Sequence, residues 1–162
     1  MRKPFLVVLP LLLISFYYSQ KITKVVKTYE NGEKRSEGNY EDGKVDGPFT
    51  FWYENGQKSY EEYYVDGIKE GKWIGWYDNG QKFIEKIYKN GKRHGPWTSF
   101  YDNGQKKSEG TFLDGVPDGL EVVWYENGKK YSELTYMNGE LISEKKWNED
   151  GSSKTDETKQ VF

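Results

Sequence analysis

Residues 71–92 read GKWIGWYDNGQKFIEKIYKNGK, and the same layout returns every 24 residues along the chain. Within it, the tetrapeptide Tyr-Glu/Asp-Asn-Gly recurs five times in a constant register. The copies begin at Tyr29, Tyr53, Tyr77, Tyr101 and Tyr125. Self-similarity at a fixed period of about 20–50 residues is typical of stacked supersecondary units. The chain is therefore predicted to be a tandem-repeat protein.

One repeat contains two predicted strands and two predicted turns. Residues 71–76 form a short aromatic run with high β propensity. Residues 81–88 mix apolar and charged side chains with the period of a return strand. Asn79-Gly80 and Asn90-Gly91 mark the turns, because both residues of an Asn-Gly pair tolerate positive φ. Turn signals this closely spaced leave no room for helices. We expect an all-β fold: an elongated, single-layer antiparallel meander of tandem 24-residue β-hairpins.

The return strand carries a lysine and, three residues later, a glutamate in every repeat. These are Lys34, Lys58, Lys82, Lys106 and Lys130, followed by Glu37, Glu61, Glu85, Glu109 and Glu133. The glutamates have two interpretations: a row of acidic sites for a cationic ligand or metal, or a structural ladder between strands and turns. Equivalent residues lie two strands apart, about 9.6 Å, which is too far for carboxylates to share one ion. The structural interpretation is favoured.

Aromatic residues dominate the apolar part of the composition. Hydrophobic residues are 35% of the chain and aromatic residues alone are 17%. Large amphipathic rings suit a sheet that is wet on one or both faces. The favoured interpretation is a core of cross-strand aromatic contacts, and an exposed ligand-binding strip is the alternative. The candidate binding surface consists of Trp52, Trp73, Trp76, Trp97 and Trp124.

The first twenty residues have the layout of a secretory signal peptide. Arg2 and Lys3 form a basic start, residues 5–16 are almost wholly apolar, and Ser19-Gln20 form the exit. A retained N-terminal anchor is the less favoured alternative, because the apolar run is short for a membrane span and Pro10 interrupts it. The chain has no cysteine, which excludes disulfides and a lipid-modified N-terminal cysteine. We expect a signal peptide over residues 1–20, about five to six hairpin units over 21–151 and a polar tail over 152–162. The protein is expected to be exported, periplasmic or secreted, and not a lipoprotein.

The sequence predicts no catalytic, cofactor or metal site. The single histidine, His94, has no supporting nucleophile motif. Its turn position holds Asp46, Glu70 and Asp118 in other repeats, which indicates solvated turn chemistry. The net charge of −2, with both signs interspersed, lacks the basic stripe of a nucleic-acid-binding protein. We therefore predict that the protein is not an enzyme and does not bind nucleic acid.

The pattern changes at the C-terminal end of the repeats. Ser143 stands where the glycine equivalent to Gly119 is expected. Residues 147–151 replace the Tyr-x-Asn-Gly turn, and their glycine comes one residue early. Terminal repeats are usually atypical, because they cap an open stack. Lys145 and Lys146 are expected near the C-terminal edge, where their charge would discourage unwanted strand pairing.

The motif Tyr-x-Asn-Gly followed by Tyr-x-x-Gly-x-x-x-Gly-x-Trp resembles the MORN repeat variant. More narrowly, it resembles bacterial exported proteins known as YwqK-type antitoxins of toxin–antitoxin systems. The resemblance extends roughly from Thr28 to Gly151 and departs from the pattern at Gly139/Ser143. It implies an elongated, twisted, single-layer β-meander that acts as a scaffold for protein contacts, with membrane or lipid attachment proposed for some MORN arrays. The matching glycine pairs are Gly43/Gly47, Gly67/Gly71, Gly91/Gly95 and Gly115/Gly119.

Three functional hypotheses follow. The favoured one is a non-enzymatic repeat scaffold of the cell envelope that binds another protein through a sheet face or edge. The second is a module that binds glycan or peptidoglycan by stacking sugars on exposed rows of tryptophan and tyrosine, a role that substitution of Trp73 or Trp97 would test. The third is an antitoxin, as the narrower resemblance implies. A membrane surface is the remaining candidate partner. Because the recurring residues are those that build the sheet, a local function is expected where the repeats disagree.

Overall fold

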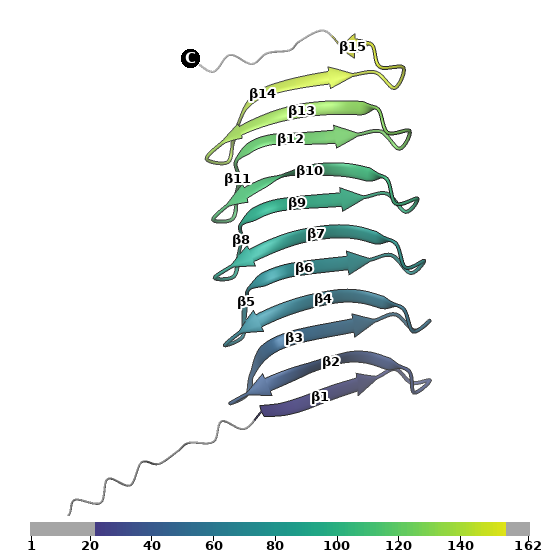
Figure 1. The fold of residues 1–162 in the computed structure, drawn as a ribbon, viewed down its shortest axis with the longest axis vertical. Helices are drawn as coiled ribbons and strands as arrows, with labels where there is room; N and C mark the ends of the chain where they lie inside the picture. The colour runs from purple at the N-terminus through teal and green to yellow at the C-terminus, as the bar shows by residue number, and fades with distance from the viewer. Residues whose placement is uncertain (1–21, 155–162) are drawn as a thin grey trace, which may run out of the picture.

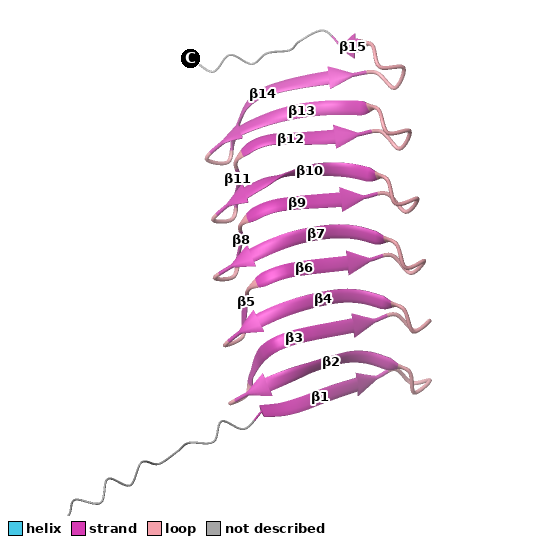
Figure 2. Cartoon of the chain, viewed as in Figure 1, coloured by secondary structure: helices cyan, strands magenta, loops and turns pink. Residues whose placement is uncertain are grey.

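The computed structural model describes residues 22–154, which form one open antiparallel sheet without helices (Figures 1 and 2). The strands follow one another as a meander, so the predicted fold class is confirmed. No helical segment in this part of the chain could span a bilayer. The predicted signal peptide lies outside the described residues. The strands are β1 (Ile22–Thr28), β2 (Lys34–Glu41), β3 (Lys44–Trp52), β4 (Lys58–Val65), β5 (Ile68–Lys69), β6 (Gly71–Trp76), β7 (Lys82–Lys89), β8 (Lys92–Arg93), β9 (Gly95–Phe100), β10 (Lys106–Leu113), β11 (Val116–Pro117), β12 (Gly119–Trp124), β13 (Lys130–Met137), β14 (Glu140–Trp147) and β15 (Ser153–Lys154).

The Tyr-x-Asn-Gly segments form five-residue turns along one side of the sheet (Figure 1). In the turn at 77–81, the Tyr77 amide donates to the Gln81 carbonyl at 2.7 Å, and the Gly80 amide donates to the Tyr77 carbonyl at 3.0 Å. Gly80 has a φ of 83°. The predicted turn is therefore confirmed, but Asn79 does not share the positive φ expected of both residues of the Asn-Gly pair. Asn79 contributes through its side chain instead, because its Oδ1 accepts the Gln81 amide at 2.9 Å.

The turns on the opposite side are two-residue turns in which both residues have positive φ. Asn90 has a φ of 50° and Gly91 a φ of 78°, as a type I′ hairpin turn requires. The Gly91 amide also donates to the Lys69 carbonyl of the preceding repeat at 2.9 Å. The second predicted Asn-Gly turn is therefore confirmed, and it also connects neighbouring repeats.

The turn tyrosine connects each repeat to the next through its hydroxyl. The Tyr53 hydroxyl, for example, donates to the Trp76 carbonyl at 2.7 Å. We call this contact the tyrosine bridge. The asparagine of the same turn adds a second bond, since Asn55 Nδ2 donates to the Asp78 carbonyl at 2.8 Å. The other tyrosine bridges join Tyr29 to Trp52 at 2.7 Å, Tyr77 to Phe100 at 3.0 Å, Tyr101 to Trp124 at 2.7 Å and Tyr125 to Trp147 at 2.9 Å.

The sheet buries few apolar side chains. Among residues 22–154, Phe49 and Val122 are the only apolar side chains below one tenth exposure. Apart from the exposed Tyr63, the other aromatic rings are half-buried, and many touch one another across strands, as predicted for a core of amphipathic rings. Tyr60, for example, lies 5.0 Å from Trp73 between ring centroids. A single layer has no opposing surface to bury these rings. Hydrogen bonds between strands and between repeats must therefore carry much of the stability.

The last hairpin keeps the turn geometry although its sequence departs from the motif. Asn148 takes the place of the turn tyrosine: its amide donates to the Ser152 carbonyl at 2.8 Å, and the Gly151 amide donates to Asn148 at 2.9 Å. Asp150 takes the place of the asparagine and accepts the Ser152 amide at 2.8 Å. Strand β15 then pairs with β14, so the sheet continues to Lys154, beyond the expected boundary at 151. The two predicted edge lysines lie on β14, which β15 covers only at its end.

Loss of a tyrosine bridge should lower the free energy of unfolding. We expect Tyr53→Phe to destabilise the protein by about 0.5–1.5 kcal/mol, because the Trp76 carbonyl loses its donor. Tyr63→Phe is the control, since the Tyr63 side chain is 45% exposed and its hydroxyl makes no hydrogen bond within the described residues. Urea unfolding followed by circular dichroism measures both. Equal stabilities of the two variants would contradict the bridging role.

Candidate interaction surface

Strand pairing divides the side chains between two faces of the sheet. Residues directly opposite each other in an antiparallel pair point to the same face. The register therefore traces one central row of side chains across each face. The aromatic face carries Gly38, Phe49, Glu62, Trp73, Lys86, Trp97, Gly110, Glu121 and Leu134. The glutamate face carries Glu37, Thr50, Glu61, Ile74, Glu85, Thr98, Glu109, Val122 and Glu133.

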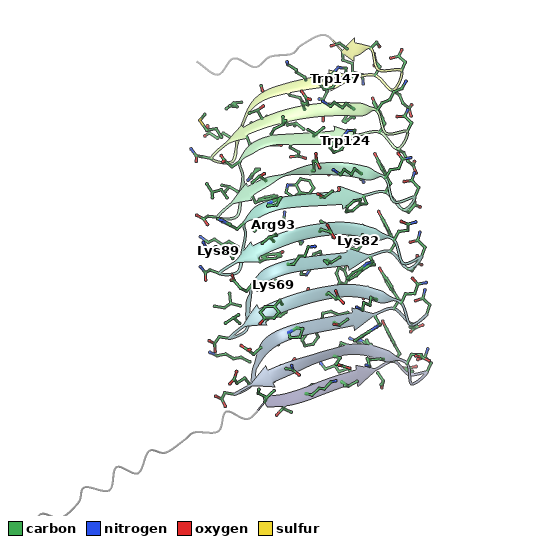
Figure 3. The ribbon with its side chains drawn as sticks, viewed as in Figure 1. Lys69, Lys82, Lys89, Arg93, Trp124 and Trp147 are labelled. Atoms are coloured by element: carbon green, nitrogen blue, oxygen red, sulfur yellow. The ribbon has the colours of Figure 1, made fainter. Side chains whose placement is uncertain are left out.

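The five tryptophans proposed from the sequence do not form one surface. Trp73 and Trp97 lie on the aromatic face. Trp52, Trp76 and Trp124 lie on the glutamate face, beside the five-residue turns. Figure 3 shows Trp124 and Trp147 towards those turns and Lys69 and Arg93 towards the opposite ends of the strands. All five tryptophans are half-buried. The candidate surface is therefore split between opposite faces of the sheet.

The glutamate ladder is paired with the lysine ladder on the same face. A β-bulge on each return strand, opposite Trp52 and Trp76 in two of the repeats, lets residues three apart point the same way, which a regular strand does not allow. Lys34 Nζ lies 2.5 Å from Glu37 and 4.9 Å from the Trp52 ring centre. The structural interpretation is thus supported by contacts within each repeat. The remaining pairs are Lys58 with Glu61, Lys82 with Glu85 at 2.5 Å, Lys106 with Glu109 at 2.8 Å and Lys130 with Glu133 at 2.5 Å.

On the aromatic face, Glu62 is the centre of a cluster that the other repeats lack. Its carboxylate accepts hydrogen bonds from the Tyr64 hydroxyl, from Trp73 Nε1 at 2.5 Å and from Lys69 Nζ at 3.1 Å. Burial alone would raise the pKa of Glu62, but these three donors outweigh it and hold the pKa below its ordinary value. Burial, followed by the Glu62 carboxylate, raises the pKa of Tyr64. The cluster is a fixed, hydrogen-bonded structure.

The ring of Trp73 is already covered within this cluster. Lys86 Nζ lies 3.8 Å from the ring centre, a cation–π distance, and Tyr60 packs against the same ring. At least part of the ring surface is therefore unavailable for stacking unless Lys86 moves. Trp97 contacts Phe112 at 6.1 Å between centroids, and no cation lies over it within the described residues.

His94 occupies a position that otherwise caps the next turn. Asp46 accepts the Asp66 amide at 2.9 Å, and Glu70 accepts the Asn90 amide at 2.7 Å. His94 instead places Nδ1 3.2 Å from the Asp114 carboxylate. The predicted turn location of His94 is confirmed. The position has a defined bonding role between repeats, which the repeat pattern did not reveal.

The exposed apolar side chains gather on the glutamate face, a feature that the sequence analysis missed. From β1 to β13, every large apolar side chain that the structure describes as exposed lies on this face. Two further exposed apolar side chains, Leu141 and Ile142, lie on β14 beside a register shift and are not assigned to this face. We define the apolar band as a first patch of Tyr63, Val65 and Ile68 and a second patch of Leu113, Val116, Leu120 and Met137, all 43–58% exposed.

A shallow hollow lies beside the first patch of the apolar band. It has a volume of about 430 Å³, and Pro48, Thr50, Tyr63 and Ile74 are among the residues that line it. A smaller hollow of about 110 Å³ repeats it one unit later, around Pro96. Among the described residues, no group of three histidine or acidic side chains could hold a metal ion. The glutamate face thus combines exposed apolar side chains with shallow hollows, which suits contact with a macromolecule.

The Glu62 cluster should make stability depend on pH. Because the folded pKa of Glu62 lies below its ordinary value of 4.5, its contribution is present above that pH and is lost as the pH falls through the folded value. We expect the wild-type chain to lose more stability between about pH 6 and pH 3 than Glu62→Gln does. Urea unfolding at both pH values measures this. Glu54→Gln, on an exposed turn, is the control, and parallel pH profiles for wild type and Glu62→Gln would contradict the assignment.

Comparison with known families accounts for the 24-residue period. The family described as MORN repeat variant matches residues 45–66, 69–90, 93–114 and 117–138. These four segments cover β3 to β13 almost completely and more than half of the chain. A comparison with curated proteins finds no match. The first and last hairpins fall outside the four matches. Residues 22–154 fold as the repeat pattern predicts, and the chain belongs to the MORN repeat variant family.

Proposed function

We propose that this MORN repeat protein is a non-enzymatic scaffold of the cell envelope that binds another protein through the apolar band. The observation that supports the proposal most is the location of the exposed apolar side chains on one face. Exposed apolar patches that gather on one face are typical of an interaction site. The aromatic face, whose rings are half-buried and packed against one another, offers less free apolar surface.

Location in the envelope is part of the same proposal. It rests on the signal-peptide pattern of residues 1–20, which lie outside the described residues. The absence of cysteine in the sequence agrees with an exported protein that is not lipid-modified at a cysteine. Fractionation of the producing cells, with the chain followed by antibody, tests this location independently of binding.

An antitoxin of the YwqK type would be a special case of this proposal. Neutralisation of a toxin is protein binding, so the apolar band would serve the same purpose. A partner that is a toxin encoded beside this chain would support the special case. A partner of another kind would leave the scaffold proposal intact and remove the antitoxin role.

Binding of cell-wall glycan is the second candidate function, and the placement of Trp73 and Trp97 favours it. They lie on the same face one repeat apart, about 9.6 Å at the usual strand spacing. Against it, Lys86 covers part of the Trp73 ring. Saturable binding to purified peptidoglycan that Trp97→Ala abolishes, with the fold intact, would favour this candidate over a protein partner.

Photo-crosslinking in the producing cells tests the protein-binding proposal. A photoreactive amino acid at Leu120 should capture one defined protein, which mass spectrometry identifies. The purified partner should then bind Leu113→Ser and Leu120→Ser more weakly. Each lost contact is expected to cost about 1–2 kcal/mol, or roughly tenfold in affinity. Both side chains are exposed, so the fold should be unchanged.

Val26→Ser is the matched control for these variants. Val26 is 48% exposed and lies on the same face, but on β1, away from the apolar band. Its substitution should leave the affinity unchanged. Equal weakening by all three substitutions, or unchanged binding by the two band variants, would contradict a site on the band.

A further inference from the structure

The segment 89–94, which contains the two-residue turn Asn90-Gly91, differs in charge from its counterparts in the other repeats. Residues 89–94 read KNGKRH and carry three cations and no acid. Each counterpart, at 41–46, 65–70, 113–118 and 137–142, contains more acids than cations. Within the described sheet, this is the one basic corner in a column of acidic corners. We call it the basic corner.

His94 lies beside the acid that would otherwise pair with Lys92, so the positive charge of Lys92 is left without an acidic partner among the described residues. In an equivalent repeat, Lys44 Nζ lies 3.7 Å from Asp66, whose amide is capped by Asp46. The counterparts of these residues are Lys92, Asp114 and His94. Here the Asp114 carboxylate lies beside the His94 ring at 3.2 Å, and Lys92 makes no ion pair within the described residues.

The cations of the basic corner lie between the two patches of the apolar band. Lys89 and Lys92 are directly paired across β7 and β8, and both are exposed on the glutamate face. Val65 and Ile68 hold the same positions one repeat earlier, and Leu113 and Val116 hold them one repeat later. At two strand spacings per repeat, the patches are about 19 Å apart. The band therefore runs apolar, basic, apolar.

We propose that the basic corner selects an acidic protein partner: one whose contact surface presents carboxylates between two apolar groups. This inference rests on the proposed function and adds the chemistry of the partner. Complementary charge at an interface fixes register and rejects wrong partners, while the apolar groups supply most of the affinity. Arg93 extends the basic corner to the other face, where its guanidinium lies 5.0 Å from the Phe112 ring centre.

Two other occupants fit the charge pattern less well. A second copy of the chain that joined the first patch to the second about a two-fold axis would place Lys89 and Lys92 against their own copies. An anionic membrane would meet the whole column of turns, and the acidic corners on both sides would be repelled by it. A local acidic group on a protein avoids both conflicts.

The test uses peptide display on the immobilised full chain. A library of random peptides of about 12 residues is long enough, when extended, to bridge both patches. Selection should enrich Asp and Glu flanked by apolar residues. A selected peptide should bind roughly three- to tenfold more weakly to Lys89→Gln/Lys92→Gln, and its own Glu→Gln version should show no such difference. Higher salt should reduce the preference.

Lys44→Gln is the matched control, because Lys44 occupies the equivalent turn but is paired with Asp66. It should bind the selected peptide as the wild type does. His94→Asp should weaken binding, since it adds an acid and releases Asp114 to pair with Lys92. Both substitutions are on exposed or half-exposed turn positions, so the sheet should be retained, and circular dichroism checks this.

The outcomes separate this inference from the proposed function. The selected peptides could be apolar, with binding that depends on Leu113 and Leu120 but no preference for acidic residues. That result would overturn the inference and leave the proposed function standing. A failure to select any peptide that depends on the band would overturn both. Binding of phosphatidylglycerol vesicles that depends on Lys89 and Lys92, without acidic peptides, would replace the protein partner with a membrane.

Discussion

The tyrosine bridge is the interaction on which the rest of this sheet depends. A single layer cannot bury its rings against a second layer, and only two apolar side chains in residues 22–154 fall below one tenth exposure. Each hairpin must therefore be held to the next by directional bonds. The hydroxyl of Tyr53, placed by its five-residue turn, reaches the Trp76 carbonyl 23 residues later. A hairpin alone is marginally stable, so these bonds and the shared strand pairing make the stack cooperative.

Once the repeats are joined in this way, the remaining positions are free to differ. The lysine–glutamate pairs and the turn glycines recur because every hairpin needs them. Glu62 and His94 do not recur in the other repeats. Glu62 accepts three hydrogen bonds and forms a half-buried cluster. His94 contacts Asp114, whose counterpart in another repeat pairs with a lysine. The backbone geometry is the same in each repeat, but these residues differ, so one turn of a regular sheet carries a net positive charge that the others lack.

Much of the fold was predictable from the period alone, because 24 residues contain two strands and two turns and nothing else. The role of Asn79 was not, since its φ depends on the length of the turn and its contribution comes from the side chain. The faces were harder still. Bulges opposite Trp52 and Trp76 shift the alternation on the return strands, so counting by two does not place Lys58 and Lys82 on the face of the glutamates. The apolar band was missed because Val65 and Leu113 lie 48 residues apart in the sequence, and only the strand pairing places them on one face. A comparison of net charge between equivalent turns would have located the basic corner.

The central claim is that equivalent turns are interchangeable in building the sheet and specific in binding. The most direct test is partner binding by a chain in which residues 89–94 are replaced by Val-Asp-Gly-Ile-Lys-Glu, the residues of 65–70. The account predicts that the sheet stays folded by circular dichroism and that the partner crosslinked at the apolar band no longer binds. Unchanged binding by the folded variant would contradict the specific role of the basic corner. Loss of the fold would contradict the interchangeability of the turns.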